Sequence, residues 1–112
     1  ARKRETTMLQ FVRNLLGGSR IEGADAQELV DTGAQLVDVR STREFAGGHI
    51  RGAKNLPVGD LEGRIRELRK DQPVVVYCAS GVRSASAAQV LSAHGFTEVH
   101  DLGGMHRWPE GR

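Results

Sequence analysis

Cys78 is the residue of this chain whose type and surroundings best suit covalent chemistry. It follows the apolar run Val-Val-Val-Tyr at 74–77 and opens the six-residue segment Cys-Ala-Ser-Gly-Val-Arg at 78–83. Where a chain turns from a strand into a helix, successive backbone N–H groups point inward and form an anion-binding nest. A thiolate in such a nest, with a cation nearby, has a lowered pKa and is a reactive nucleophile. The segment therefore predicts a catalytic cysteine thiolate.

The residues that follow Cys78 support this hypothesis. Gly81 permits a tight backbone path, Arg83 adds a positive charge, and Ser84 is placed to cap the next helix. The alternative is that a lone cysteine at a strand end is a small buried hydrophobic residue. A core cysteine needs no glycine, arginine or serine beside it, so the pattern favours the nucleophile. The predicted substrate-binding residues are those of the nest: Ala79, Ser80, Gly81, Val82, Arg83 and Ser84.

Strand and helix signals alternate along the chain, and these elements must position the cysteine segment. Short apolar or β-branched runs predict strands at 20–22, 35–39, 53–57, 74–77 and 98–100. Caps, helical spacing and terminal glycines predict four helices. The first runs from Asp25 to about 30 and is ended by Gly33, and the second starts at the capping box of Ser41 and Glu44 and is ended by Gly47 and Gly48. The third spans about 60–70, and the fourth runs from about 85 to near Gly95. This alternation predicts an α/β fold, a mostly parallel sheet of about five strands with helices on both faces.

Ligands of such open sheets bind beyond the carboxyl ends of the strands. Cys78 follows one predicted strand end directly. The segment from Asp38 to Glu44 lies at and after another strand end. We therefore expect both to face the same site.

The charge distribution and the cysteine count exclude several classes of function. The 112 residues hold 16 Lys and Arg against 14 Asp and Glu, and beyond the charged residues at 2–5 there are 13 of each sign. A basic N-terminal tip is not the basic patch with aromatic residues that binds nucleic acid, so no nucleic-acid partner is expected. One cysteine forms no intramolecular disulfide, and no Cys/His spacing suggests a metal site. A reducing, cytoplasmic location is expected.

The pattern also divides the chain into a tail and one domain. Residues 1–19 are predicted to be a tail with a short amphipathic helix, and residues 20–112 the domain. The apolar positions of the tail, between Met8 and Leu16, are interrupted by polar residues and are too short a stretch to span a bilayer. No stable membrane insertion is therefore expected. The helix is expected to pack on the domain, with a partner or a membrane surface as the alternative.

Three ordered motifs run through residues 21–108. They are Leu-Val-Asp-Val-Arg at 36–40 followed by Glu-Phe at 44–45, Gly-His-Ile at 48–50, Gly-Ala at 52–53 and Asn55; Cys-x-x-Gly-x-Arg-Ser at 78–84; and Leu-x-Gly at 102–104 with Trp108. Together they resemble the motifs of the rhodanese-like sulfurtransferases in their single-domain form. Arg51 is one departure, because the family commonly has proline at that position.

The resemblance implies a three-layer, rhodanese-like α/β domain whose cysteine cycles between thiol and persulfide. Cys78 would take a sulfane sulfur from a donor such as thiosulfate or a persulfide. It would pass that sulfur to a thiophilic acceptor, which is cyanide in vitro and a thiol or a protein in the cell. The loop amides would stabilise the anionic sulfur in both states, so no metal or organic cofactor is expected. A protein-to-protein persulfide carrier and a non-catalytic regulatory module are the alternatives.

Cysteine phosphatases and arsenate reductases provide a rival interpretation, since they also hold a thiolate in an anion-binding loop. Their signature is His-Cys-x5-Arg. Here Tyr77 precedes Cys78, and four residues separate Cys78 from Arg83. A shorter loop encloses a smaller nest, which suits a sulfane sulfur better than a tetrahedral phosphate.

Four further residues are expected to support the loop: Asp38, Arg40, Glu44 and His49. Arg83 has two candidate roles, binding the anionic end of a donor or pairing with Asp38 or Glu44. Pairing is favoured, because a buried arginine usually meets a carboxylate. Arg40 and Glu44 are expected to form a second, more exposed pair. His49 is expected to make a structural hydrogen bond rather than to act as a base, because an ionised thiolate needs no base.

Overall fold

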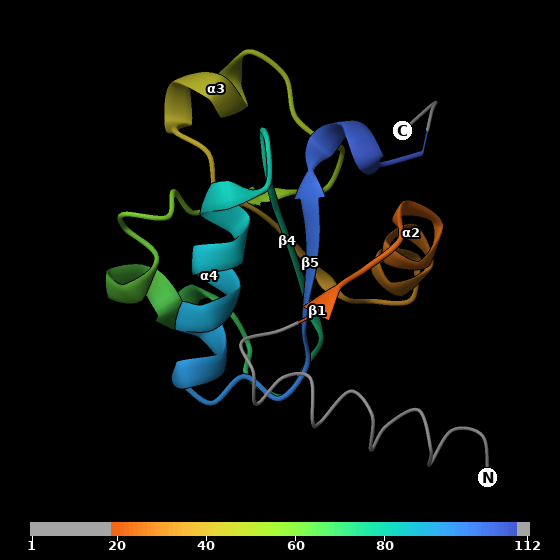
Figure 1. The fold of residues 1–112 in the computed structure, drawn as a ribbon. Helices are drawn as coiled ribbons and strands as arrows, with labels where there is room; N and C mark the ends of the chain where they lie inside the picture. The colour runs from red at the N-terminus through yellow and green to blue at the C-terminus, as the bar shows by residue number, and fades with distance from the viewer. Residues whose placement is uncertain (1–18, 110–112) are drawn as a thin grey trace, which may run out of the picture.

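Five parallel strands form one sheet, and helices cover both of its faces (Figure 1). The computed structural model describes residues 19–109. Its strands are β1 (Ser19–Arg20), β2 (Gln35–Asp38), β3 (Lys54–Asn55), β4 (Val74–Cys78) and β5 (Val99–Gly104), and its helices are α2 (Gly23–Asp31), α3 (Thr42–Ala46) and α4 (Val82–Ala93), with two short 3-10 helices, η1 (Glu62–Glu67) and η2 (Met105–Arg107). The strand order is β1-β5-β4-β2-β3, and every pair of neighbours is parallel. The predicted α/β fold is confirmed.

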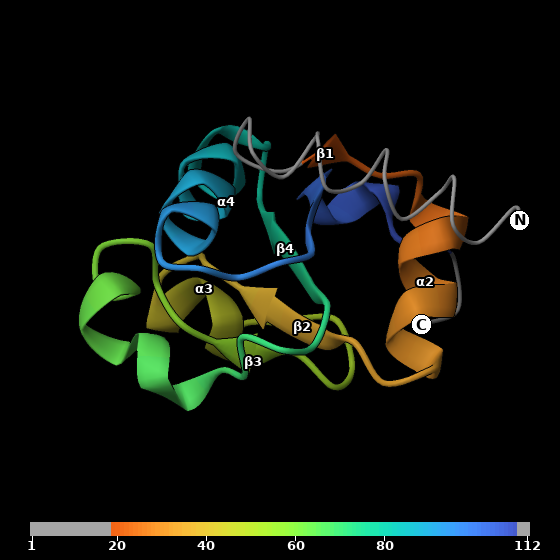
Figure 2. The same ribbon diagram turned by 90° about the horizontal axis from the view of Figure 1, so that it is seen from below.

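The central strand β4 is buried on both faces and separates two hydrophobic cores. Val74, Val76 and Cys78 belong to the core beneath α4, whereas Val75 and Tyr77 belong to the core on the side of α2. Figure 2 shows α4 and η1 on one side of the sheet and α2 on the other. Successive side chains of a strand point to opposite faces of the sheet, so a strand that is apolar throughout contributes side chains to a core on each face. Cys78 thereby reaches the α4 side.

The helix predicted at 60–70 is wrong in type and in length. The segment forms the 3-10 helix η1 instead, with a kink at Arg64 (φ −116°, ψ 17°). Gly63 lowers helix propensity within this short stretch. The apolar positions still do what their spacing predicts, since Leu61 and Leu68 are buried and Ile65 packs against the same core.

The ends of the two longer helices differ from the capping predictions. Asp25 is not a cap, because α2 begins at Gly23, and Asp25 lies in the first turn, where a negative charge is favourable. Ser84 is not a cap either, because α4 begins after Gly81, whose backbone adopts the left-handed region (φ 110°). The capping box of α3 is confirmed, with Ser41 and Glu44 bonded reciprocally.

The last strand is longer than the predicted segment 98–100. β5 continues to Gly104, because its end is held by pairing with β4, where Tyr77 lies opposite Gly103 and Cys78 opposite Gly104. Glycines have low strand propensity, so the pattern did not indicate this extension. The predicted tail helix lies outside the described residues, and within residues 19–109 no helix is long and apolar enough to cross a membrane.

Candidate active site

Cys78 is the last residue of β4, and its side chain is completely buried. Tyr77 is level with Asp38, the last residue of β2, and Cys78 is level with Gly104 at the end of β5. The two segments predicted to face one site therefore do meet at one edge of the sheet. Gly104 leaves no room for a side chain there, since a β-carbon on it would lie 2.5 Å from His106 Cε1 and 2.7 Å from the Ala79 carbonyl oxygen.

The thiol lies at the N-terminus of α4, in the nest that the sequence predicts. The Gly81 amide donates to Cys78 Sγ at 2.9 Å, and the Ser84 amide donates to it at 3.4 Å. Gly81 achieves this with a positive φ, which an L side chain rarely adopts. Two backbone donors at a helix terminus stabilise negative charge on the sulfur.

The rest of the loop forms an exposed rim around this buried centre. Ala79 and Ser80 are exposed, and Val82 is 74% exposed, whereas Gly81 and Ser84 are buried. The loop thus offers amides to the sulfur on its inner side and small or apolar side chains to solvent on its outer side.

Two opposing influences set the pKa of the Cys78 thiol. Burial is the larger single influence and raises the pKa, but hydrogen bonds from the Ser84 amide and hydroxyl and from the Gly81 and Ser80 amides together outweigh it. The pKa of Cys78 is therefore lowered. Because this pKa is lower in the folded chain than in the unfolded chain, ionisation of Cys78 contributes to stability, and that contribution is fully present above the unfolded pKa. That contribution is lost as the pH falls through the folded pKa.

Replacing Ser84 with alanine is expected to raise the pKa of Cys78. The Ser84 hydroxyl has one proton, which it can donate either to the Gly81 carbonyl oxygen, 3.2 Å away, or to Cys78 Sγ. A hydrogen bond to the sulfur favours the thiolate and lowers its pKa. The measurement is the pH dependence of Cys78 alkylation by iodoacetamide, with its midpoint below that of a free cysteine in the wild type and higher in Ser84→Ala. Ser86→Ala, on the exposed face of the same helix, is the matched control. Equal midpoints in the wild type and Ser84→Ala would contradict this role for the hydroxyl.

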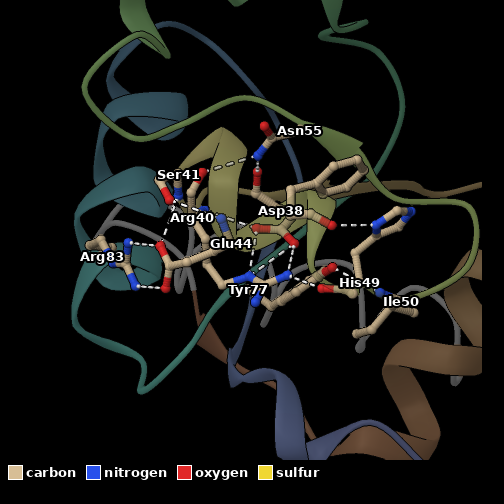
Figure 3. A network of polar contacts seen from close by, with 11 residues as sticks. Asp38, Arg40, Ser41, Glu44, His49, Ile50, Asn55, Tyr77 and Arg83 are labelled. Atoms are coloured by element: carbon tan, nitrogen blue, oxygen red, sulfur yellow. Dashed lines mark hydrogen bonds and ion pairs between the residues drawn. The ribbon is translucent and has the colours of Figure 1, made fainter.

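Arg83 pairs with Glu44 and not with Asp38 (Figure 3). Its two terminal nitrogens donate to the two carboxylate oxygens at 2.8 and 3.1 Å. The hydrogen bond from Arg83, aided by the Ser41 amide, lowers the pKa of Glu44 to about 2. This half-buried pair links the start of α4 to α3 and braces the loop from outside.

Asp38 pairs with Arg40, so the expected pair between Arg40 and Glu44 is wrong. Arg40 donates to the buried Asp38 carboxylate through its backbone amide (2.9 Å), Nε (3.0 Å) and Nη2 (2.7 Å). Arg40 Nη2 also donates to the Gly48 carbonyl oxygen. Arg40 does not pair with Glu44 because Asp38 and Arg40 are only two residues apart and both side chains turn inward, whereas Glu44 is held at the capping box of α3.

Two residues extend this buried network. The Tyr77 hydroxyl accepts a hydrogen bond from the Ile50 amide at 3.0 Å, and burial, together with a hydrogen bond to Asp38, raises the pKa of Tyr77. Asn55 Nδ2 donates to the carbonyl oxygens of Asp38 and Arg40, both at 3.0 Å. The network therefore fixes the ends of β2, β3 and β4 relative to one another.

His49 lies on the surface, outside this network. Its ring stacks on Phe45 with centroids 3.6 Å apart, and Nδ1 lies 2.8 Å from the Phe45 carbonyl oxygen. This contact is the structural hydrogen bond expected for His49. In residues 19–109 no group of three or more His, Cys, Asp or Glu side chains is arranged to hold a metal ion.

One part of the site was missed by the sequence reasoning. Arg20, on β1, and Arg107, in η2, approach Gly103 at the end of β5. The adjacent glycines Gly103 and Gly104 were the available signal, because paired glycines often mark a close approach of other groups to the backbone.

A parallel sheet that holds a cysteine against the N-terminus of α4 is the arrangement expected of a rhodanese-like domain, and comparison with known families gives the same result. The model of the rhodanese-like domain family matches residues 22–110, and the chain belongs to this family.

Individual relatives fall within the same family. The chain is 51% identical over 76 residues to the uncharacterized protein YqhL of Bacillus subtilis (strain 168), a match that spans 67% of this chain and 60% of YqhL. It is 42% identical over 90 residues to the thiosulfate sulfurtransferase GlpE of Ectopseudomonas mendocina (strain ymp), covering 80% of this chain and 83% of GlpE. The structure of the human single-domain sulfurtransferase TSTD1 superposes with a TM-score of 0.75 at 28% identity, covering 83% of this chain and 96% of TSTD1.

Proposed function

We propose that this chain is a sulfurtransferase that carries a sulfane sulfur on Cys78 as a persulfide. The observation that carries the proposal is the position of Cys78 Sγ, 2.9 Å from the Gly81 amide at the N-terminus of α4. Preorganised amides stabilise negative charge on Sγ in the thiolate, and the N–H groups of the same loop favour negative charge on the outer sulfur of a persulfide. The relatives named thiosulfate sulfurtransferase support the same chemistry.

The reaction is two displacements at sulfur. With thiosulfate as donor, the Cys78 thiolate attacks the outer sulfur, a bond forms between Sγ and that sulfur, and sulfite leaves with the electron pair of the broken S–S bond. A nucleophilic acceptor then attacks the outer persulfide sulfur and takes it, and the Cys78 thiolate leaves and is regenerated. Both steps use residues of this chain alone.

A protein acceptor is a second candidate, favoured by the exposure of Val82 at the rim of the loop. In this case Cys78 carries the sulfur between proteins and discharges it to a specific partner rather than to small thiols. The single cysteine suits a reducing compartment such as the cytoplasm in either case.

The test is intact mass spectrometry after incubation of the wild-type protein with thiosulfate. We expect the protein to gain the mass of one sulfur atom and to lose it on treatment with cyanide or a reducing thiol. A carrier would form the same persulfide but discharge it rapidly only to its protein partner. The proposal fails if no sulfur donor produces the persulfide while an aryl phosphate is turned over through Cys78, which is the outcome expected of a phosphatase.

A further inference from the structure

Two guanidinium groups flank Gly103 at the end of β5, next to the Cys78 loop. A β-carbon placed on Gly103 would lie 2.9 Å from Arg20 Nη1 and 3.4 Å from Arg107 Cδ. A β-carbon placed on Gly81 would lie 3.6 Å from Arg20 Nη2 and 3.6 Å from Gly103 Cα. Arg20 therefore reaches from β1 across Gly103 to the same glycine whose amide donates to Cys78 Sγ.

Each of the other arginines near the loop is held by a hydrogen bond from at least one terminal nitrogen. Both terminal nitrogens of Arg83 are bound by Glu44, and Arg40 Nη2 is bound by Asp38 and the Gly48 carbonyl oxygen. Arg107 donates through Nη2 to the Ile21 carbonyl oxygen at 2.8 Å. The hydrogen-bonded nitrogens of these three arginines would have to give up their partners to bind a substrate, and Arg107 Nε is buried.

Arg20 is held differently. Its Nε lies 3.6 Å from Asp101 Oδ2, which is an ion pair too long for a hydrogen bond, and its side chain is 52% exposed. The other oxygen of Asp101 accepts a hydrogen bond from the Gly103 amide at 2.8 Å. Within residues 19–109, no hydrogen bond engages Nη1 or Nη2 of Arg20. Asp101 thus orients the guanidinium through Nε, and the two terminal nitrogens remain beside the loop.

We propose that Arg20 binds the anionic end of the sulfur donor and so selects donors whose leaving group carries a sulfonate. This inference rests on the proposed sulfur-transfer function. When Cys78 attacks the outer sulfur of thiosulfate, the remaining sulfonate gains electron density and leaves as sulfite. A guanidinium with two parallel N–H groups matches the oxygens of that group. Arg20 binds the donor, whereas Arg83 braces the loop.

The test compares two donors that deliver the same sulfur to Cys78. Thiosulfate has a sulfonate at its remote end, and the persulfide of 2-mercaptoethanol has a neutral hydroxyethyl group there. Arg20→Gln is expected to lower kcat/KM for thiosulfate about tenfold, the effect of one lost charged hydrogen bond, and to change kcat/KM for the persulfide little. Arg20→Lys keeps the charge without the planar fork and is expected to retain part of the preference for thiosulfate. Added salt should reduce the difference between the wild type and Arg20→Gln.

Arg69→Gln is the matched control, because Arg69 Nε lies 3.5 Å from Asp71 Oδ1 and Arg69 precedes the N-terminal end of β4, whereas Cys78 is at its C-terminal end. It changes the net charge equally and should leave both donors unaffected. Thermal unfolding of each variant separates a folding defect from a binding defect, and Arg20→Lys supplies the comparison if Arg20→Gln does not fold. Equal losses with both donors, or no loss with thiosulfate, would overturn the role of Arg20. A wild-type protein that forms no persulfide with either donor would instead overturn the proposed function.

Discussion

Replacing Cys78 with serine is expected to lower thiosulfate-to-cyanide sulfur transfer by at least about 10⁴-fold, as loss of a catalytic nucleophile does in other enzymes. A serine hydroxyl is not ionised at neutral pH, so the amides that stabilise a thiolate in this loop would face a neutral oxygen. The measurements are the steady-state rate and the intact mass after incubation with thiosulfate. We expect no labile sulfur on Cys78→Ser. Gain of the same labile mass would show that the nucleophile is wrongly assigned.

A second thiol position tests whether the loop or the thiol alone is responsible. Cys78→Ser combined with Ser86→Cys restores one thiol on α4, the helix that follows the Cys78 loop, but at an exposed position outside the nest. We expect this double variant to remain inactive, because its thiolate lacks the amides of Gly81 and Ser84. Recovery of transfer in the double variant would mean that the nest is not needed.

The second large effect is expected on stability, at the buried pair of Asp38 and Arg40. Asp38→Asn is expected to lower the free energy of unfolding by about 3–5 kcal/mol, because it leaves a buried guanidinium without its carboxylate. The Asp38 carboxylate also accepts a hydrogen bond from the Arg40 amide and interacts with the Tyr77 hydroxyl, so its loss is felt at the ends of β2 and β4. Urea denaturation measures the change.

Glu67→Gln is the control for this prediction. Glu67 also pairs with two cations, Lys54 at 3.1 Å and Arg64 at 2.8 Å, but these groups are half exposed. Solvent screens exposed pairs and side-chain entropy opposes them, so we expect a much smaller loss of stability than for Asp38→Asn. Losses of similar size in the two variants would contradict the importance of burial at Asp38.

The sequence was informative wherever the signal is local and repeated. The run at 74–77 predicted β4, because a strand buried on both faces is apolar along its length. The run at 35–39 predicted β2 through its apolar residues Leu36, Val37 and Val39, although Gln35 and Asp38 are polar. The capping box of α3 depends on two residues three positions apart, and it was read correctly. The nest around Cys78 likewise depends on a strand, a glycine and a helix in immediate succession.

The partners of the charged residues were beyond the reach of the sequence. Arg83 could pair with Asp38 or Glu44, and only the packing of α3 against the start of α4 decides for Glu44. Arg20 and Gly81 are far apart in sequence, and their approach depends on β1 lying beside β5. The 3-10 helix η1 shows the same limit, because spacing identifies its buried face but not its hydrogen-bonding pattern.

At the contact between Gly81 and Gly103, two properties of the site depend on different parts of the chain. Both glycines have positive φ, and the loop and the end of β5 meet there backbone to backbone. The donors that stabilise the sulfur are main-chain amides, which most substitutions leave in place. Donor preference, by contrast, depends on the side chain of Arg20 at the edge strand. A single substitution there can change which donor is accepted while the framework that activates Cys78 is inherited intact.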